Sequence, residues 1–96
     1  MFLLNVSYSQ NPAAVEPHIA SHGAWVKQYV EAGVFVAAGP KRNGLGGVIL
    51  AQVASRAQLD DILAQDSYVM ANVATYQIEE FDFKITQPEV AALKAV

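Results

Sequence analysis

The sequence contains no cysteine and only two histidines, which narrows its possible chemistry. Without cysteine the chain forms no disulfide, has no thiolate nucleophile and lacks the sulfur ligands of most structural zinc sites. Lysine and arginine together number 6 against 9 acidic residues, and the formal net charge is −3. Nucleic-acid-binding surfaces are basic, so we expect no nucleic-acid partner.

Long apolar segments are also absent. No apolar run approaches the roughly 20 residues of a membrane-spanning helix. The N-terminal segment MFLLNVSYSQ lacks the basic start of a signal peptide and is more typical of a strand. We therefore expect no membrane association and, since cysteine is absent, a cytoplasmic location.

Charged residues make up only 16% of the chain, against about 25% in ordinary domains, while hydrophobic residues make up 53%. A domain of 96 residues buries only about 60–65% of the surface that its unfolded chain exposes. So many apolar residues in so small a domain indicate a second apolar face that another molecule covers. The composition thus predicts an obligate oligomer.

The alternation of apolar positions and the turn residues predict six elements in the order β-α-β-β-α-β. Ser55 and Gln58 form the pattern of a capping box, which predicts that the second helix begins after Ser55. In the last strand the apolar positions change sides near Glu79 and Glu80, so we expect a β-bulge there. The predicted strands are 2–8, 34–39, 47–54 and 72–85, and the first helix follows Pro17 and ends near Gly33.

This order is the ferredoxin-like pattern, an α+β fold in which two helices cover one face of a four-stranded antiparallel sheet. The other face of the sheet would be bare in a monomer. We therefore expect two copies to pack sheet against sheet as a homodimer, a dimeric α+β barrel. Residues 1–86 are assigned to this domain, and 87–96 are expected to form a C-terminal tail or a short helix.

The two histidines lie four residues apart in the segment HIASHGAW, residues 18–25. At 100° per residue, His22 falls near the middle of the apolar stripe of the first helix and His18 near its edge. A buried imidazole without a hydrogen-bond partner costs about 1–3 kcal/mol, so His22 is expected to have one. A zinc site is not expected, because zinc needs three or four protein ligands and the HExxH pattern is absent.

Asp66 is the expected partner of His22. It follows Leu63 by three residues and Ile62 by four, and so continues the inward face of the second helix. We expect it at the C-terminal end of that helix, where a carboxylate is unfavourable by about 0.3–1 kcal/mol. His22 and Asp66 are each unfavourable at their own positions, but both positions are explained if the imidazole forms a hydrogen bond with the carboxylate. The alternative is a satisfied core histidine and an unrelated aspartate at a helix end.

The glycine-rich segment GPKRNGLGG, residues 39–47, is predicted to be a hairpin loop. It lacks the GK[ST] ending of a phosphate-binding loop and does not open a helix. Its two cations, Lys41 and Arg42, could steer an anionic substrate toward a nearby cleft.

Three segments resemble the YCII-related (YciI-like) family of dimeric α+β barrels, over about residues 2–85. HGAWVKQYVEAGVFVAAGP (22–40) is similar to the family's helix that runs from a histidine to an AGP ending, and DSYVMANV (66–73) is similar to its DP[FY]xxAGV segment. GGVILAQVASRAQLDDIL resembles the strand and helix between them. The resemblance implies that His22 and Asp66 form the His–Asp pair of the family, in a pocket between sheet and helices.

The chain departs from this family pattern at three positions. Ser67 replaces the usual proline, Asn72 the usual glycine, and Ile19 a common basic residue. The His–Asp pair is unaffected, but the site for a substrate anion is in doubt. His18 could stand in for the missing basic residue.

We expect a small-molecule enzyme without a cofactor, a lyase or an isomerase, in which His22 oriented by Asp66 takes a proton from a small cyclic or aromatic compound. The resemblance implies elimination, such as dehydrochlorination, or isomerisation. The alternatives are a non-catalytic barrel that binds or senses a small ligand, and a cofactor-free monooxygenase, for which Trp25 and Asn5 are hints. The residues expected to line the substrate pocket are His18, Ser7, Tyr8, Trp25 and Tyr68.

Overall fold

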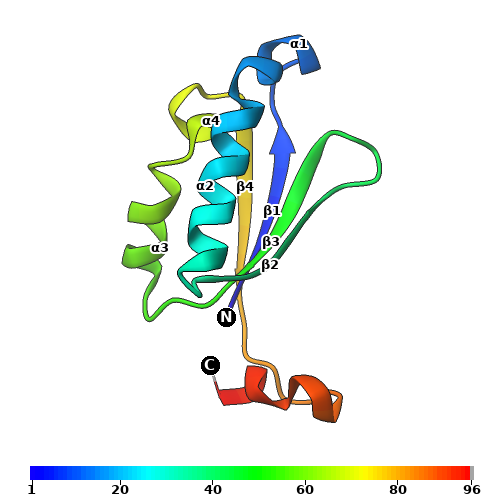
Figure 1. Cartoon of the computed structure of the whole chain (residues 1–96), viewed down its shortest axis with the longest axis vertical. Coiled ribbons are helices and arrows are strands. Elements are labelled where there is room, and N and C mark those ends of the chain that lie inside the picture. Colours follow the sequence, from blue (N-terminus) through cyan, green and yellow to red (C-terminus); the bar gives the residue numbers. More distant parts are fainter. Residues whose placement is uncertain (96) are drawn as a thin grey trace.

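The computed structural model describes residues 1–95. Its elements follow the predicted β-α-β-β-α-β order, with short helical turns before the first long helix and before the last strand (Figure 1). The strands are β1 (Phe2–Tyr8), β2 (Phe35–Pro40), β3 (Gly46–Ala51) and β4 (Ala74–Glu80). The helices are α1 (Pro12–Val15), η1 (Glu16–His18), α2 (Ile19–Glu31), α3 (Arg56–Leu63), α4 (Ser67–Met70) and η2 (Pro88–Ala95), of which η1 and η2 are 3-10 helices.

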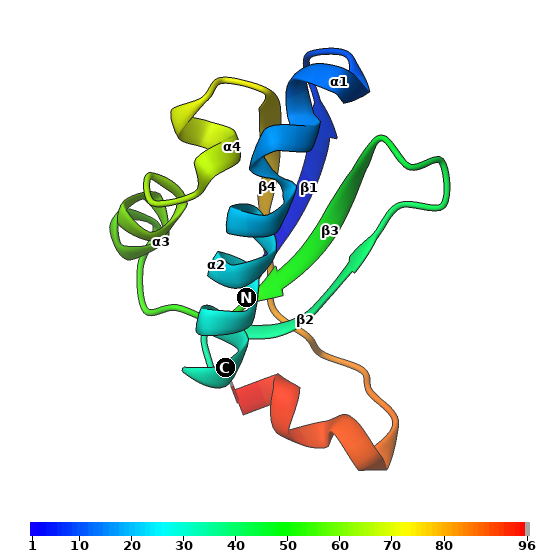
Figure 2. The same cartoon turned by 45° about the horizontal axis from the view of Figure 1, so that its top comes forward.

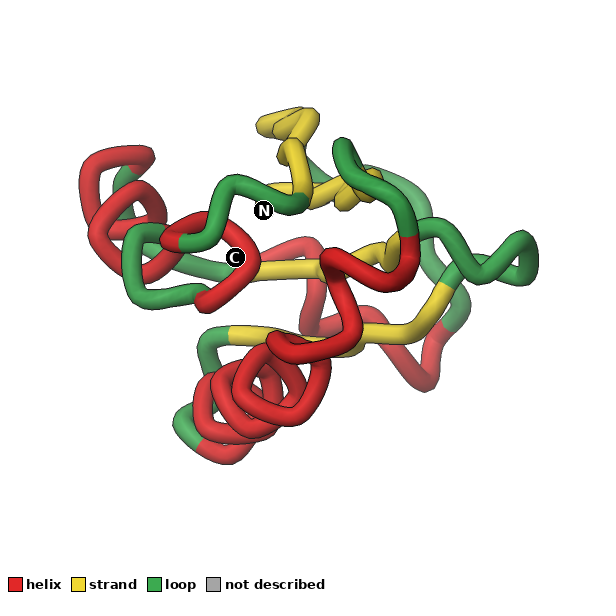
Figure 3. Tube along the Cα trace, turned by 90° about the horizontal axis from the view of Figure 1, so that it is seen from above, coloured by secondary structure: helices red, strands yellow, loops and turns green. Residues whose placement is uncertain are grey.

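The four strands form one antiparallel sheet in the order β2-β3-β1-β4. The longest helix, α2, lies across the sheet with α3 beside it, and the β2–β3 hairpin diverges from α2 toward its loop (Figures 1 and 2). Figure 3 shows this arrangement from above. The predicted α+β fold with a four-stranded antiparallel sheet is confirmed.

Alternate residues of the central strand β1 define two different sheet faces. Phe2, Leu4 and Val6 are at most 2% exposed and pack with the helices, whereas Leu3 and Asn5 point to the opposite face, which no helix covers. We call this opposite face the open face. The buried core under the helices comprises Phe2, Leu4, Val6, Val15, Trp25, Phe35, Ile49, Ala51, Leu59, Leu63, Tyr68, Val73 and Ala74.

The predicted bulge near Glu79 and Glu80 is wrong. The β1–β4 ladder runs without a shift from Tyr8 opposite Ala74 to Phe2 opposite Glu80, and β4 ends there. One further hydrogen bond joins the two segments, from the Phe81 amide to the carbonyl of Met1 at 2.9 Å. The point at which the apolar residues change sides therefore marks the end of β4. A register shift occurs instead in β2, at residues 35–37.

The C-terminal segment lies apart from the helices, below the sheet in the view of Figure 1. Phe81 and Phe83 pack edge to face against each other, with ring centroids 4.9 Å apart, and Ile85 is 93% exposed. η2 follows, with a kink at Val90. Within residues 1–95 no helix is long and apolar enough to cross a membrane.

The short helix α4 explains the DSYVMANV segment physically. Asp66 is its N-cap and accepts a hydrogen bond from the Tyr68 amide, so Ser67 occupies the first helical position, which proline also tolerates. After the helix, Asn72 adopts a positive φ of 56°. Glycine and asparagine reach this left-handed region at low cost, and the chain then turns into β4.

We expect Asn72 to tolerate glycine but not alanine. Asn72→Ala should lower the free energy of unfolding by about 1 kcal/mol, because a Cβ without a compensating side chain is strained at positive φ. Asn72→Gly should leave it unchanged or raise it. Chemical denaturation of the three proteins measures both effects. Equal losses for alanine and glycine would show that the asparagine side chain, and not the backbone, is required.

Candidate functional site

Helix α2 carries the first half of the site. Asn11 caps the helical entry by accepting from the Ala14 amide at 3.0 Å, and α2 then runs through His22 to Glu31. Trp25 is 5% exposed and donates from its indole to the carbonyl of Ile62 at 3.1 Å. This bond ties α2 to α3 and holds His22 beside the segment that follows α3.

Asp66 lies at 0% exposure and accepts three hydrogen bonds. Its Oδ1 accepts from His22 Nδ1 at 2.7 Å and from the Tyr68 amide at 3.1 Å, and its Oδ2 accepts from the Tyr76 hydroxyl at 2.6 Å. The expected contact between His22 and Asp66 is therefore present. The expected position of Asp66 at a helix C-terminus is wrong, because α3 ends at Leu63 and Asp66 begins α4, where a carboxylate is favourable.

These contacts select one tautomer of His22. A carboxylate only accepts hydrogen bonds, so Nδ1 carries the proton and Nε2 carries the lone pair of the neutral ring. The imidazole stacks on Tyr68 with centroids 3.8 Å apart and planes 4° from parallel, and Trp25 lies 5.6 Å away. The ring is thus held in one orientation by its hydrogen bond and its aromatic neighbours.

Both tyrosines around Asp66 remain hydrogen-bond donors. Burial, and then the hydrogen bond to Asp66, raises the pKa of Tyr76 above its ordinary value. Burial, and then the hydrogen bond to Tyr8, does the same for the pKa of Tyr68. The two phenols therefore keep their protons near neutral pH and act there as hydrogen-bond donors.

Two serines join the segments on which the pair sits. Ser21 precedes His22, Ser67 follows Asp66, and their hydroxyls are 2.7 Å apart. Ser21 donates to Ser67, and Ser67 in turn donates to the carbonyl of His18 at 3.1 Å. The hydroxyl that replaces the usual proline of the family pattern thus holds the N-terminus of α2 against α4.

A cavity of about 320 Å³ opens between α2 and the β2–β3 hairpin. Its polar groups are those of His22, Tyr8 and Tyr68, and the hydroxyls of the two tyrosines are 3.4 Å apart. Apolar residues and glycines form the rest of the wall. They are Val6, Ile19, Gly23, Val26, Ala38, Gly39, Pro40, Gly46, Gly47, Val48 and Ile49.

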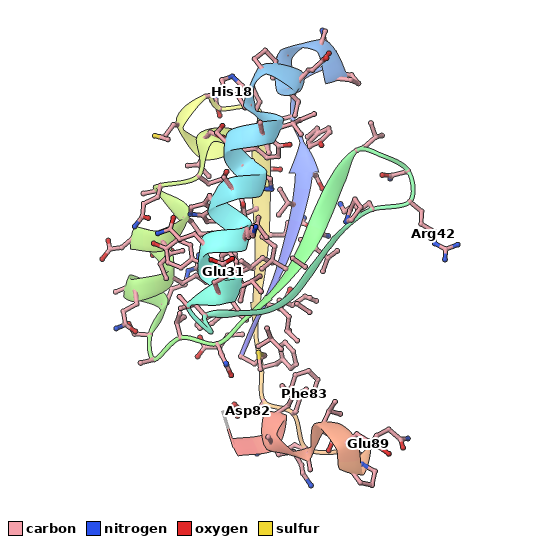
Figure 4. All side chains as sticks on the ribbon, in the orientation of Figure 1. His18, Glu31, Arg42, Asp82, Phe83 and Glu89 are labelled. Carbon is pink, nitrogen blue, oxygen red and sulfur yellow. The ribbon has the colours of Figure 1, made fainter. Side chains whose placement is uncertain are left out.

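Two of the five residues expected to line the substrate pocket, Tyr8 and Tyr68, line this cavity. Ser7 points to the open face, where its hydroxyl accepts from Lys41 Nζ at 2.9 Å. Trp25 does not line the cavity, because its indole packs against α3 and donates to Ile62. The side chain of His18 lies at the N-terminal end of α2, outside the cavity wall (Figure 4).

The cations of the hairpin loop lie outside the cavity wall as well. Lys41 is bound to Ser7, and Arg42 projects from the tip of the loop (Figure 4). Asn5, one hint of a monooxygenase, lies on the open face, and Trp25, the other, does not reach the cavity either. Within residues 1–95, no group of three or more histidine or acidic side chains is arranged to hold a metal ion.

Sequence reasoning missed Tyr76 and Gly23. Tyr76 falls on an apolar face of the last predicted strand, but a buried tyrosine hydroxyl needs a hydrogen-bond partner, and that requirement is a usable signal. Gly23 lies four residues after Ile19 and three before Val26, so it shares their helix face and lines the cavity with them.

Comparisons with known proteins agree with this fold. Residues 1–82 match the family profile of the YCII-related domain, which confirms the resemblance seen in the sequence. A solved structure of 5-chloro-2-hydroxyhydroquinone dehydrochlorinase (TftG) from Burkholderia phenoliruptrix AC1100, in complex with 2,5-dihydroxybenzoquinone, is similar with a TM-score of 0.70. The two chains are 12% identical, and the match covers 88% of this chain and 96% of the other. No curated protein matches the sequence.

The Tyr76 hydroxyl should stabilise the protein through Asp66. Tyr76→Phe removes a donor from a fully buried carboxylate, and we expect it to lower the free energy of unfolding by about 1–3 kcal/mol. Tyr29→Phe is the matched control, because its hydroxyl bonds Gln65 at the surface, and it should cost less than about 1 kcal/mol. Urea unfolding of both variants makes the comparison. Equal losses would contradict a special role for the bond to Asp66.

Proposed function

Because the chain belongs to the family of YCII-related domains, we propose that it is a cofactor-free enzyme in which His22 takes a proton from a small cyclic compound. The observation that carries the proposal is the hydrogen bond of 2.7 Å between His22 Nδ1 and the buried Asp66. It leaves Nε2 as the nitrogen available to a ligand in the cavity that His22 lines. Asp66 also stabilises the imidazolium that forms when the proton is taken.

The reaction class follows from what the cavity offers. Nε2 removes a proton from a carbon of the substrate, the electron pair of the C–H bond forms a double bond, and a leaving group such as chloride departs with its own electrons. If no leaving group is present, the imidazolium returns the proton to another carbon and the product is an isomer. The similarity in fold to a dehydrochlorinase supports the elimination.

His22 should dominate turnover. Loss of a general base costs about 10²–10⁴-fold in rate, and we expect His22→Gln to show a loss of this size. Asp66→Asn should also lower the rate, because an amide can present its N–H to Nδ1 and so favour the wrong tautomer. Chloride release or deuterium uptake from D₂O, screened over chlorinated and hydroxylated ring compounds, measures the rate.

The assignment of His22 as the base has a matched control and a result that would contradict it. Glu31→Gln, at the far end of α2, should leave the rate unchanged. Turnover by His22→Gln at the rate of the unaltered protein would contradict the assignment of the base. In that case the apolar cavity would favour the second candidate function, a barrel that binds a small ligand without converting it.

We further propose that the protein works as a homodimer joined through the open face. Its accessible surface is 5993 Å², whereas a compact monomer of 10.3 kDa exposes about 5,400 Å². The excess is of the order of the ~800 Å² that each partner buries in a stable complex. Apolar side chains remain exposed on the sheet: Leu3, Val36 and Val48 are 36–39% exposed. By the alternation along their strands, Leu3 and Val48 direct their side chains to the open face.

The dimer is tested by placing a charge on this face. Leu3→Glu should convert the dimer to a monomer in sedimentation equilibrium at micromolar concentration, because a carboxylate in the interface would be buried without a partner. Val30→Glu, on α2, replaces a side chain of similar exposure, 42% against 37%, and should leave the dimer intact. A monomer for the unaltered protein would contradict the assembly.

A further inference from the structure

Gly23 has no evident structural reason to be glycine. It lies inside α2, where glycine is less favourable than alanine, and its φ is not in the positive region that glycine alone adopts easily. A Cβ built on Gly23 meets no atom within 4 Å outside its own helix backbone and chain neighbours. Packing within the chain and backbone conformation therefore both permit a side chain at this position.

The remaining reason for a glycine is the close approach of something to the helix backbone. Gly23 lines the cavity beside His22, between Ile19 and Val26 of the same helix face. A side chain at this position would project into the space beside the imidazole. Gly23 thus keeps room for a ligand at the point where His22 Nε2 is available.

The sheet wall of the cavity is also built from small residues. Ala38 pairs with Ile49, and Gly47 pairs with Val6, so both occupy the sheet face that the helices cover. A Cβ on Gly47 would lie 3.0 Å from the carbonyl oxygen of Gly39, a tight contact that disfavours a larger residue in this strand. Residues with small or no side chains therefore line the cavity on both its helix wall and its sheet wall.

The lining also restricts the charge of the ligand. None of the lining residues within 1–95 is a lysine, an arginine or a carboxylate, and Lys41 is directed to Ser7. A carboxylate or phosphate ligand would be placed in a mostly apolar cavity without a cation, which is costly. The hydroxyls of Tyr8 and Tyr68, 3.4 Å apart, can instead bond neutral oxygen atoms.

We propose that Gly23 determines the specificity of the site, by admitting an uncharged, flat, hydroxylated ring that lies between α2 and the sheet with its oxygens toward Tyr8 and Tyr68. The size agrees, because a cavity of about 150 Å³ holds one benzene ring and this cavity is about 320 Å³. One ring with substituents therefore fits. This inference rests on the proposed function and adds the class of the ligand.

Resorcinol is the probe, and cyclohexane-1,3-diol and benzoate are its controls. In amide NMR titrations at up to about 20 mM, resorcinol should shift the signals of Gly23, Val26 and Gly47, since small fragments bind weakly. The saturated diol has the same hydroxyl spacing but is not flat, and benzoate is flat but anionic, so both should bind at least about tenfold more weakly. Absence of shifts with resorcinol, or equal binding of either control, would overturn the proposal.

Substitution of Gly23 links the ligand to the residue. Gly23→Val should weaken resorcinol binding about tenfold or more, and Gly23→Ala by a smaller factor, because each fills part of the cavity. Ala24→Val changes the neighbouring exposed position, which does not line the cavity, and should bind as the unaltered protein does. Gly23→Ala should also raise the Tm by about 2–6 °C, which shows that the variant is folded.

The result separates this inference from the assignment of the base. Turnover by His22→Gln tests the base, whereas resorcinol binding by Gly23→Val tests the ligand, so the two measurements fail independently. If Gly23→Val binds resorcinol with full affinity, the inference fails and the base assignment stands. If His22→Gln retains full turnover while Gly23→Val loses binding, the base assignment fails and the inference stands.

Discussion

The buried carboxylate of Asp66 is the group on which both the local fold and the site depend. It receives one hydrogen bond from α2, one from the first turn of α4 and one from β4. A carboxylate removed from water is costly unless such donors replace its hydration. The donors must therefore be in place together, and this requirement fixes the position of α2 against the end of the sheet. The orientation of the His22 ring is a consequence of the same constraint.

Stability and chemistry are not separable at this site. Asp66 caps α4 as well as orienting His22, so replacing the pair by apolar residues would leave the Tyr76 hydroxyl and the Tyr68 amide without their acceptor. At the cavity, in contrast, one residue lowers the stability of its helix and has no structural role of its own. Gly23 is less favourable in a helix than alanine, and the structure gives no packing reason for it. If Gly23 determines specificity as proposed, room for a ligand is maintained at some cost to the stability of the helix.

The sequence predicted the framework of the fold because long periodic segments dominate it. The apolar stripe of α2 placed His22 inward, and the inward face of α3, extended by three residues, led to Asp66. The four-residue helix α4 was missed because a single turn is too short for an apolar pattern to repeat. The end of β4 was predicted to be a bulge because the apolar residues change from one side of the strand to the other there. This pattern alone does not show whether the residues still pair with a neighbouring strand.

The candidate site was only half visible in the sequence for a related reason. A pair such as His22 and Asp66 can be inferred from two helix faces, but the cavity depends on where α2 and the hairpin diverge, which no local pattern encodes. Tyr8 and Tyr68 therefore entered as candidates together with Ser7, which the strand alternation directs to the other face. Three-dimensional placement was needed to separate them.

The tautomer of His22 tests the account most directly. In protein labelled with ¹⁵N-histidine, the two ring nitrogens give distinct signals for the protonated and the unprotonated form, at a pH where the ring is neutral. The account predicts that His22 carries its proton on Nδ1, bonded to Asp66, and leaves Nε2 unprotonated. A neutral ring protonated on Nε2 would contradict it, because neither the hydrogen bond to Asp66 nor a base directed to the cavity would then exist.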